Sequence, residues 1–281
     1  MGLVGESGCG KSTLARAIIN LYKPTSGKVV FAGVDFSQLT KKELRARCKD
    51  IQMVFQDPYS SLNPRMTVYQ VLRDELLHHK MCTKDEVKGR VKELMELVGL
   101  SEDQAGRLPS AFSGGQRQRI GIARALAVEP KLIIADEPVS ALDVSIQAQI
   151  INLLCDLQDK LGVSIMFISH DLRVVRYISD RVAVMYLGSL VETADTDTLY
   201  EHPLHPYSKV LLAAAPSMAE DRTGEKKAAV LGELPSPINL PSGCHFHPRC
   251  PYADDICKNE SPELHDAGNS HFVACHHPLT A

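Results

Sequence analysis

Tryptophan is absent from the sequence, and aromatic residues of all kinds make up only 5% of its 281 residues. No run of about 18 apolar residues occurs, so no segment predicts a membrane-spanning helix. The first residues lack the basic and apolar stretches of a secretory signal, which favours a cytosolic protein. With 31 Lys+Arg, 34 Asp+Glu and a net charge of −3, the composition argues against binding nucleic acid through bulk charge. The length predicts about two domains.

Cysteine is sparse over most of the chain but clustered at its end, at Cys244, Cys250, Cys257 and Cys275. In a cytosolic protein this cluster favours a metal site over disulfides, because cytosolic thiols are kept reduced. Four thiolates suit a [4Fe–4S] cluster or a Zn²⁺ ion. The spacing lacks the C-x₂-C pairs of zinc ribbons and so favours iron–sulfur, while four free thiols are a third interpretation. A mixed-ligand zinc site could draw on His245, His247, His271, His276 and His277.

Composition also changes near residue 230, after the small, polar stretch at residues 219–229. Six of the 11 histidines and seven of the 16 prolines lie beyond residue 231. This change predicts a boundary and a small C-terminal extension rich in Cys, His and Pro. The extension has too few apolar residues for a core of its own, which a metal site would compensate.

Apolar stretches alternate with helical periodicities over the first 200 residues, which predicts a mostly parallel α/β sheet covered on both faces. Residues 57–128 are helical without strands and predict an inserted helical subdomain. Capping-box patterns at Thr40, Thr83 and Ser113 mark predicted helix starts. The predicted strands are residues 1–4, 29–31, 51–55, 132–135, 163–168 and 181–187, the last of which closes the series. A long helix is predicted over residues 144–161 and a short one after residue 171.

A glycine-rich turn at residues 5–12 fits the phosphate-loop pattern G-x-x-x-x-G-K-[ST] at every fixed position. Glycines let the backbone wrap closely round an anion, so that amide N–H groups and a helix start face a phosphate. Lys11 is expected to reach the β- and γ-phosphates, and Ser12 to bind Mg²⁺. An ordinary glycine turn is the alternative. The predicted ATP-binding residues are Gly5, Glu6, Ser7, Gly8, Cys9, Gly10, Lys11, Ser12 and Thr13.

Two further motifs point to the same chemistry. The apolar strand at residues 132–135 ends in Asp136 and Glu137, where Asp136 suits Mg²⁺ and Glu137 suits deprotonation of an attacking water. A second anion site is predicted where a helix opens with two glycines, because its dipole and free amides face outward. A simple helix cap is the alternative there. The residues of this second motif are Ser113, Gly114, Gly115 and Gln116.

Together these motifs resemble the ATPase subunits of ABC transporters, with Ser140-Ala141-Leu142-Asp143 and a late His170 in the family's order. The resemblance covers residues 1 to about 200 and is specific. Residues 56–64 (QDPYSSLNP), His205-Pro206-Tyr207, residues 235–237 and Cys250-Pro251 are similar to the oligopeptide/dipeptide importer branch. The implied fold is that of a P-loop NTPase, and some ATPases of this branch carry a [4Fe–4S] cluster in such a tail.

The resemblance also implies roles for single residues. Glu137, His170 and Gln56 would be catalytic, with His170 on the γ-phosphate and Gln56 contacting the attacking water. Ser12, Gln56 and Asp136 would hold Mg²⁺. The segment from Ser113 to Gln116 would face the phosphate loop of a second subunit, and Asp143 would lie at the dimer seam.

The resemblance implies a division of the chain and a set of partners. The ATPase core would comprise residues 1–56 and 129–200, the helical signature subdomain 57–128, a linker with the His-Pro-Tyr helix 201–230, and the metal-binding extension 231–281. The partners would be a homologous ATPase subunit (homo- or heterodimer), two membrane permease subunits and, indirectly, a substrate-binding protein, but no nucleic acid. Residues 59–66 would contact the permease at the cytoplasmic face of the membrane.

One departure from the family pattern is the start of the chain, four residues before Gly5, where members carry further strands and an adenine-stacking aromatic residue. We therefore expect weak nucleotide binding and assign no adenine-stacking residue. Two alternative functions remain: a non-catalytic or truncated regulatory partner that supplies only its signature segment, and a soluble ABC ATPase outside transport.

Overall fold

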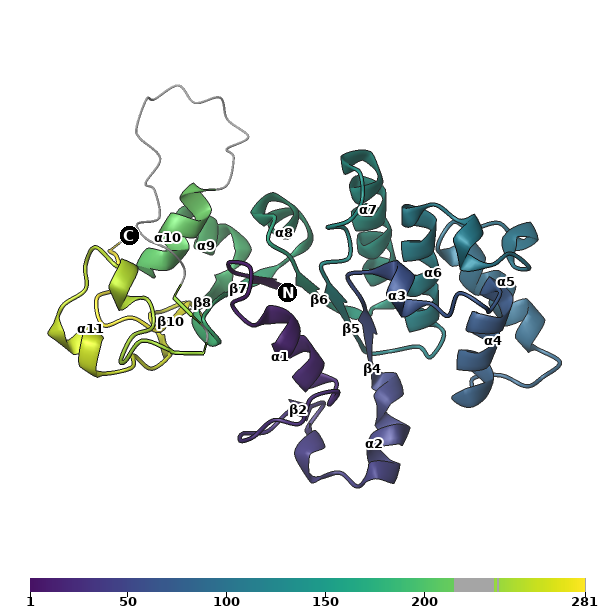
Figure 1. Cartoon of the computed structure of the whole chain (residues 1–281), viewed down its shortest axis with the longest axis horizontal. Helices are drawn as coiled ribbons and strands as arrows, with labels where there is room; N and C mark the ends of the chain where they lie inside the picture. The colour runs from purple at the N-terminus through teal and green to yellow at the C-terminus, as the bar shows by residue number, and fades with distance from the viewer. Residues whose placement is uncertain (215–234, 237, 281) are drawn as a thin grey trace. The chain divides into compact units, whose positions relative to one another are not determined.

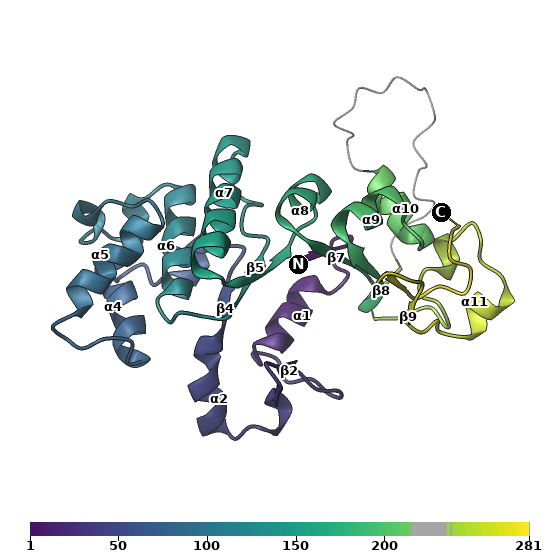
Figure 2. The ribbon, with the colours of Figure 1, turned by 180° about the vertical axis from the view of Figure 1, so that it is seen from behind.

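The structure is a computed structural model that describes residues 1–214, 235–236 and 238–280. The chain forms two compact units (Figures 1 and 2). The first contains Met1–Ser12 and the described part of the chain from Phe167 onward, and the second contains Thr13–Met166. The predicted boundary near residue 230 and most of the predicted linker lie outside the described residues. The other predicted domain limits stay predictions.

The second unit is built around two neighbouring parallel strands, β4 (Ile51–Val54) and β5 (Leu132–Asp136), with Val54 opposite Ala135. A two-stranded antiparallel hairpin, β2 (Val30–Phe31) and β3 (Val34–Asp35), forms a separate sheet. The helices are α2 (Lys41–Arg47), α3 (Pro58–Ser61), α4 (Val68–His78), α5 (Val87–Leu97), α6 (Gly114–Leu126) and α7 (Val144–Leu161).

Helices α4, α5 and α6 pack beside one another, as Figures 1 and 2 show. Their shared core is made of fully buried side chains such as Leu72, Met95 and Ile120. No strand interrupts the described helices between residues 57 and 128, as the periodicity predicts. At Thr83 the carboxylate of Glu86 accepts hydrogen bonds from the Thr83 N–H and hydroxyl, but α5 begins only at Val87.

In the first unit, strand β1 (Gly2–Val4) runs parallel to β7 (Arg181–Tyr186) on one side and to the last two residues of β6 (Ser164–Ile168) on the other. Helix α1 (Lys11–Ile18) begins in this unit and continues into the second one. The remaining helices are α8 (Leu172–Ile178), α9 (Thr196–Glu201), α10 (Pro206–Ala213) and α11 (Asp255–Asn259).

The prediction that a strand at residues 181–187 closes the series is wrong. Strand β8 (Ser189–Asp195) pairs antiparallel with β7, and β10 (Phe272–Val273) and β9 (His265–Asp266) extend the sheet further. Leu187 and Gly188 both have positive φ (42° and 83°), which makes the tight turn between β7 and β8. The C-terminal extension is therefore joined to the sheet of the first unit.

Candidate functional site

The turn between β1 and α1, residues 5–10, has the backbone geometry of a phosphate loop. Gly8 (φ 79°) and Gly10 (φ 107°) occupy conformations that favour glycine. At Gly5, an added Cβ would lie 2.2 Å from the carbonyl oxygen of Met185, so no larger residue fits. Ser12 and Thr13 follow in the first turn of α1. The loop is thus shaped to turn successive amide groups toward an anion.

The side chain of Lys11 is almost fully buried, with 5% of its surface exposed. Its ammonium group donates hydrogen bonds to the carbonyl oxygens of Gly5 (2.8 Å) and Glu6 (3.0 Å), so it lies across the loop. Burial raises the pKa of the neighbouring Cys9 thiol, which keeps that side chain neutral. Lys11 is therefore the positive charge that the loop offers to a phosphate.

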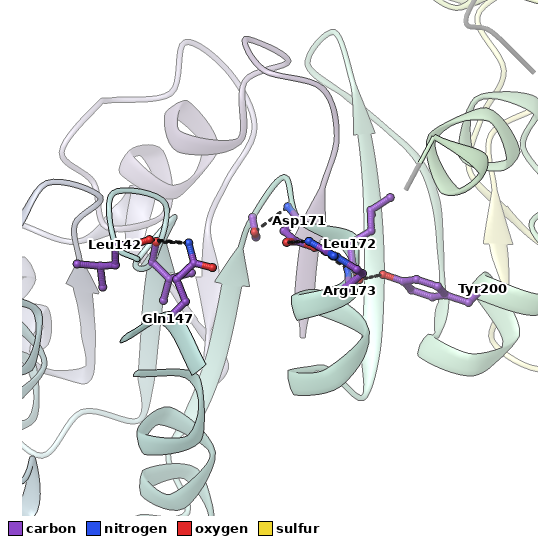
Figure 3. Close-up of polar contacts among 8 residues, drawn as sticks. Leu142, Gln147, Asp171, Leu172, Arg173 and Tyr200 are labelled. Atoms are coloured by element: carbon purple, nitrogen blue, oxygen red, sulfur yellow. Dashed lines mark hydrogen bonds and ion pairs between the residues drawn. The ribbon is translucent and has the colours of Figure 1, made fainter. Parts of the chain in front are cut away.

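His170 leaves the sheet at the same edge as the phosphate loop, because β6 runs parallel to β1 with Ile168 opposite Leu3. The residues on either side of His170 fix the turn, because the Ser169 hydroxyl accepts a hydrogen bond from the Asp171 N–H (3.0 Å). Asp171 also caps α8 and forms an ion pair with Arg173 (2.9 Å), which lowers the pKa of Asp171 (Figure 3).

Leu172 follows this cap, and its carbonyl oxygen accepts a hydrogen bond from the Tyr200 hydroxyl (Figure 3). Tyr200 belongs to α9 and packs against the guanidinium of Arg176, 5.2 Å from the ring centre. The turn that presents the exposed His170 is thus held by a cap and by a neighbouring helix.

In the second unit, the carboxyl ends of the neighbouring strands β4 and β5 bring Gln56 close to the acidic pair Asp136 and Glu137. Asp136 is buried (2% exposed) at the end of β5. Glu137 follows with φ 45°, a strained conformation for a residue other than glycine, which is common at functional sites. The Gln56 amide donates a hydrogen bond to the Glu137 carboxylate (3.1 Å) and lies 3.5 Å from the Ser140 hydroxyl.

Helix α6 begins at the predicted second anion motif with a complete capping box. The Ser113 hydroxyl accepts from the Gln116 N–H (3.3 Å), and the Gln116 side chain accepts from the Ser113 N–H (3.0 Å). A Cβ on Gly115 would lie 2.4 Å from Cγ2 of Ile146 in α7, so this glycine lets the two helices pack closely.

The segment between Glu137 and α7 is held by Gln147, whose side-chain amide donates to the carbonyl oxygens of Val139 (3.1 Å) and Leu142 (2.9 Å) (Figure 3). Asp143 follows as the exposed N-cap residue of α7, with Val144 beside it at 81% exposure.

In the first unit, all four C-terminal cysteines line one small pocket, together with the histidine and proline that open α10. Burial raises the pKa of each thiol, that of Cys275 to about 11, so metal binding would have to displace the protons. The pocket-lining residues are His205, Pro206, Cys244, Phe246, His247, Cys250, Tyr252, Cys257, Cys275, His276 and His277.

The C-terminal extension offers two possible donor sets: the four thiols of the pocket, and a smaller group that joins one of these thiols to a carboxylate and an imidazole. Among the described residues, only Asp254, Cys257 and His277 offer ligand atoms within 4.8 Å of one another, so no three of the four sulfurs are that close. Four thiolates on one Zn²⁺ would lie about 3.8 Å apart, given Zn–S bonds of about 2.3 Å, whereas a cubane holds each thiolate on a different iron.

An orphaned polar atom also faces this pocket. His205 is buried, and burial lowers its pKa to about 4, so the ring is neutral. Its Nδ1 accepts a hydrogen bond from the Tyr207 N–H (3.0 Å), which puts the ring proton on Nε2. That Nε2 has no hydrogen-bond partner within the described residues, and a thiolate or sulfide in the pocket would give it one.

The sequence did not predict the contacts that join the phosphate loop to α10 and to the C-terminal extension. Arg249 forms an ion pair with Glu6 (2.8 Å), and the Tyr207 hydroxyl accepts a hydrogen bond from the Glu6 N–H (2.9 Å). The only signal was the His205-Pro206-Tyr207 motif, because pairs separated by more than 200 residues leave no local pattern.

Two family models match the chain. The model described as "ABC transporter" matches residues 1–140, and that described as "Oligopeptide/dipeptide transporter, C-terminal region" matches residues 191–257. The chain is 56% identical to the oligopeptide transport ATP-binding protein AppF of Bacillus subtilis (strain 168), over 98% of this chain and 84% of that protein. It is 54% identical to the oligopeptide transport ATP-binding protein OppF of Salmonella typhimurium, over 98% of this chain and 83% of that protein.

Among solved structures, the chain resembles a dimeric post-hydrolysis state of the ATP-binding cassette MJ0796 bound to ADP and Pi. The TM-score is 0.63 at 32% sequence identity, and the match covers 69% of this chain and 84% of that one. This likeness confirms the predicted P-loop ATPase fold.

Proposed function

The chain belongs to the family of ABC transporter ATP-binding proteins, and we propose that it is the ATP-hydrolysing subunit of an importer of oligopeptides or dipeptides. The observation that carries this proposal is the phosphate loop with its buried Lys11 ammonium group. The cargo is inferred from the match of the C-terminal region and from the names of the relatives. Among the described residues no helix is long and apolar enough to cross a bilayer. The chain would act peripherally at the cytoplasmic face of the membrane.

In this proposal the phosphates of ATP lie on the amide groups of residues 5–13, with Lys11 on the β- and γ-phosphates and His170 at the γ-phosphate. Catalysis is then mainly positioning and charge stabilisation of the transferred phosphoryl group. Mg²⁺, when bound, offsets phosphate charge. The hydroxyl of Ser12, the amide oxygen of Gln56 and the carboxylate of Asp136 suit it, because Mg²⁺ prefers oxygen ligands.

Glu137 is the proposed general base. Its carboxylate takes the proton of the attacking water, and the Gln56 amide, hydrogen-bonded to Glu137 at 3.1 Å, orients that water. Gln56 lies between β4 and α3, two residues after the strand ends, so a shift of Gln56 would be passed to the helices that follow it.

A second, homologous ATPase subunit completes the proposed site. Residues 113–116 of one subunit, with their capping box and exposed helix N-terminus, would face the phosphate loop of the other. Asp143 and the 81%-exposed Val144 would lie at the seam between subunits. The partner is either another copy of this chain or a related one.

The permease is proposed to dock on a pocket of about 420 Å³ within the second unit. Apolar side chains such as Phe36, Leu44 and Phe55 line it, and Phe55 immediately precedes Gln56. Arg124, in the wall of the pocket, donates a hydrogen bond to the carbonyl oxygen of Ser61 at the end of α3, which links the pocket to residues 59–66, the predicted permease contact. A permease segment seated here would contact the residues next to the hydrolytic site. The substrate-binding protein would act only through the permease.

The four-cysteine pocket is proposed to hold a [4Fe–4S] cluster, with Zn²⁺ as the alternative. Cys244, Cys250, Cys257 and Cys275 would be the ligands, and the cluster would stabilise an extension with few apolar residues. Anaerobically purified protein is then expected to be brown, with about four irons per chain. Cys257→Ser should lose this iron, whereas Cys155→Ser, outside the pocket, should keep it. Colourless protein with stoichiometric zinc would establish the alternative.

The hydrolytic role is tested by steady-state ATPase assays on the wild type and Glu137→Gln, alone and with the permease. We expect the variant to bind ATP but to hydrolyse it at least about 100-fold more slowly. Glu201→Gln in α9 is the control and should keep wild-type activity. If the wild type is no faster than Glu137→Gln under both conditions, the chain is a non-catalytic partner.

The transport role needs two further measurements. Uptake of a labelled peptide into vesicles that contain the permease, with the binding protein outside, should require ATP and this subunit together. Leu44→Asp places a charge in the docking pocket and should weaken co-purification with the permease, whereas Lys42→Asp, exposed on the same helix, should not. Undiminished co-purification of Leu44→Asp would exclude this docking surface.

A further inference from the structure

A single acidic side chain in the phosphate loop, Glu6, is held from outside the loop by the C-terminal extension. Both terminal nitrogens of the Arg249 guanidinium group donate to the carboxylate, Nη1 to Oε2 at 2.8 Å and Nη2 to Oε1 at 3.0 Å. The Arg249 side chain is 5% exposed and the Glu6 side chain is 25% exposed, so water screens this bidentate ion pair only partly. Arg249 also donates to the Tyr186 hydroxyl at 3.3 Å.

The backbone of Glu6 is held as well. Its N–H donates to the hydroxyl of Tyr207, which belongs to α10 and is fully buried. The Tyr207 ring packs against Tyr186 (4.6 Å between ring centres) and Phe246 (5.4 Å). Side chain and backbone of this one loop residue are therefore fixed by two different segments of the same unit.

This arrangement matters for an anionic ligand. A carboxylate within a phosphate loop repels a triphosphate, and the repulsion is strong where water is partly excluded. Arg249 cancels the charge of Glu6 and, because it is a rigid fork, also fixes its direction. Without Arg249 the loop would present a free negative charge close to the phosphates.

We propose that Arg249 is a positioning residue of the nucleotide site, which neutralises Glu6 and holds the first turn of the phosphate loop. The affinity of the chain for ATP then depends on its C-terminal extension. The inference rests on the proposed function only in that the loop binds ATP. It assigns Arg249 no contact with the nucleotide.

The test is a set of equilibrium titrations of the full chain with ATP. Arg249→Gln should weaken ATP binding at least tenfold and raise KM with little change in kcat. Glu6→Gln alone should have a small effect, and the double variant should bind ATP nearly as well as Glu6→Gln. This rescue is the decisive readout, because a purely structural role of Arg249 would leave the double variant as weak as Arg249→Gln.

The control is Arg181→Gln, which breaks another contact between the sheet and the extension (Arg181 to the Ser270 carbonyl), together with an ion pair to Asp195 of β8, without touching the loop. It should leave ATP affinity unchanged, and circular dichroism checks that each variant is folded. Unchanged affinity of Arg249→Gln, or no rescue in the double variant, would overturn the inference. A wild type that binds no ATP would instead refute the proposed function.

Discussion

Gly115, in the first turn of α6, allows a quantitative prediction of how an added methyl group changes the stability of the chain. A Cβ at this position would lie 2.4 Å from Cγ2 of Ile146, whereas carbon atoms pack at about 3.5–4.0 Å. In Gly115→Ala, α6 and α7 must therefore separate by about 1 Å or Ile146 must leave its rotamer. Such overpacking costs about 1–3 kcal/mol, and the higher helix propensity of alanine offsets at most about 1 kcal/mol of this.

We expect the midpoint temperature of thermal unfolding (Tm) of Gly115→Ala to lie below that of the wild type by about 2–4 °C for each kcal/mol of stability lost. We also expect its ATPase activity to be lower. Gly114→Ala is the matched control. Its Cβ would meet only a terminal methyl of Leu142 at 3.1 Å, which can rotate away, so stability should change by less than about 0.5 kcal/mol. Ile146→Ala removes the clashing methyl group. The double variant Gly115→Ala/Ile146→Ala should therefore lose less free energy of unfolding than the two single variants lose together. Equal stability of Gly115→Ala and the wild type, or strict additivity, would refute this reasoning.

The remaining predictions concern the contacts round the phosphate loop and the cysteine pocket. Tyr207→Phe leaves the Glu6 N–H without its partner and should destabilise the chain by about 1–3 kcal/mol in urea unfolding; an unchanged midpoint would show that water replaces the hydroxyl. Cys250, a ligand of the proposed cluster, directly follows Arg249. On that proposal, removing the cluster with a chelator should weaken ATP binding by the wild type. The ATP affinity of the double variant Glu6→Gln/Arg249→Gln should not change with the chelator. An equal loss of affinity in both proteins would show that the metal does not act through the contact between Arg249 and Glu6. By linkage, ATP should raise the equilibrium affinity of the proposed site for its metal, measured as the share of iron that the wild type retains at equilibrium with a chromogenic chelator.

The parts of the site that sequence predicts best are those with local signals. The phosphate loop follows a strand and precedes a helix as expected, and the helix over residues 144–161 has the predicted limits. The capping boxes at Thr40 and Ser113 form with both hydrogen bonds. Each of these patterns lies within a few residues, so the chain's own spacing determines it.

The features that sequence did not predict depend on distant partners. Strand β10 pairs with β8 although about 80 residues separate Phe272 from Thr193, and two residues carry no periodicity. The buried Glu192 accepts hydrogen bonds from the Leu204 and His205 N–H groups, and it pairs with His271 at 2.7 Å. The contact with His271 forms only when the C-terminal extension has folded onto the sheet.

The central claim is that ATP binds in the phosphate loop of this chain, and calorimetric titration of Glu137→Gln with Mg·ATP tests it most directly. This variant should not consume the ligand during the measurement. We predict one ATP per chain, and a loss of at least tenfold in affinity when Lys11→Ala is added. Equal affinity of the two proteins, or no binding by Glu137→Gln, would contradict the account.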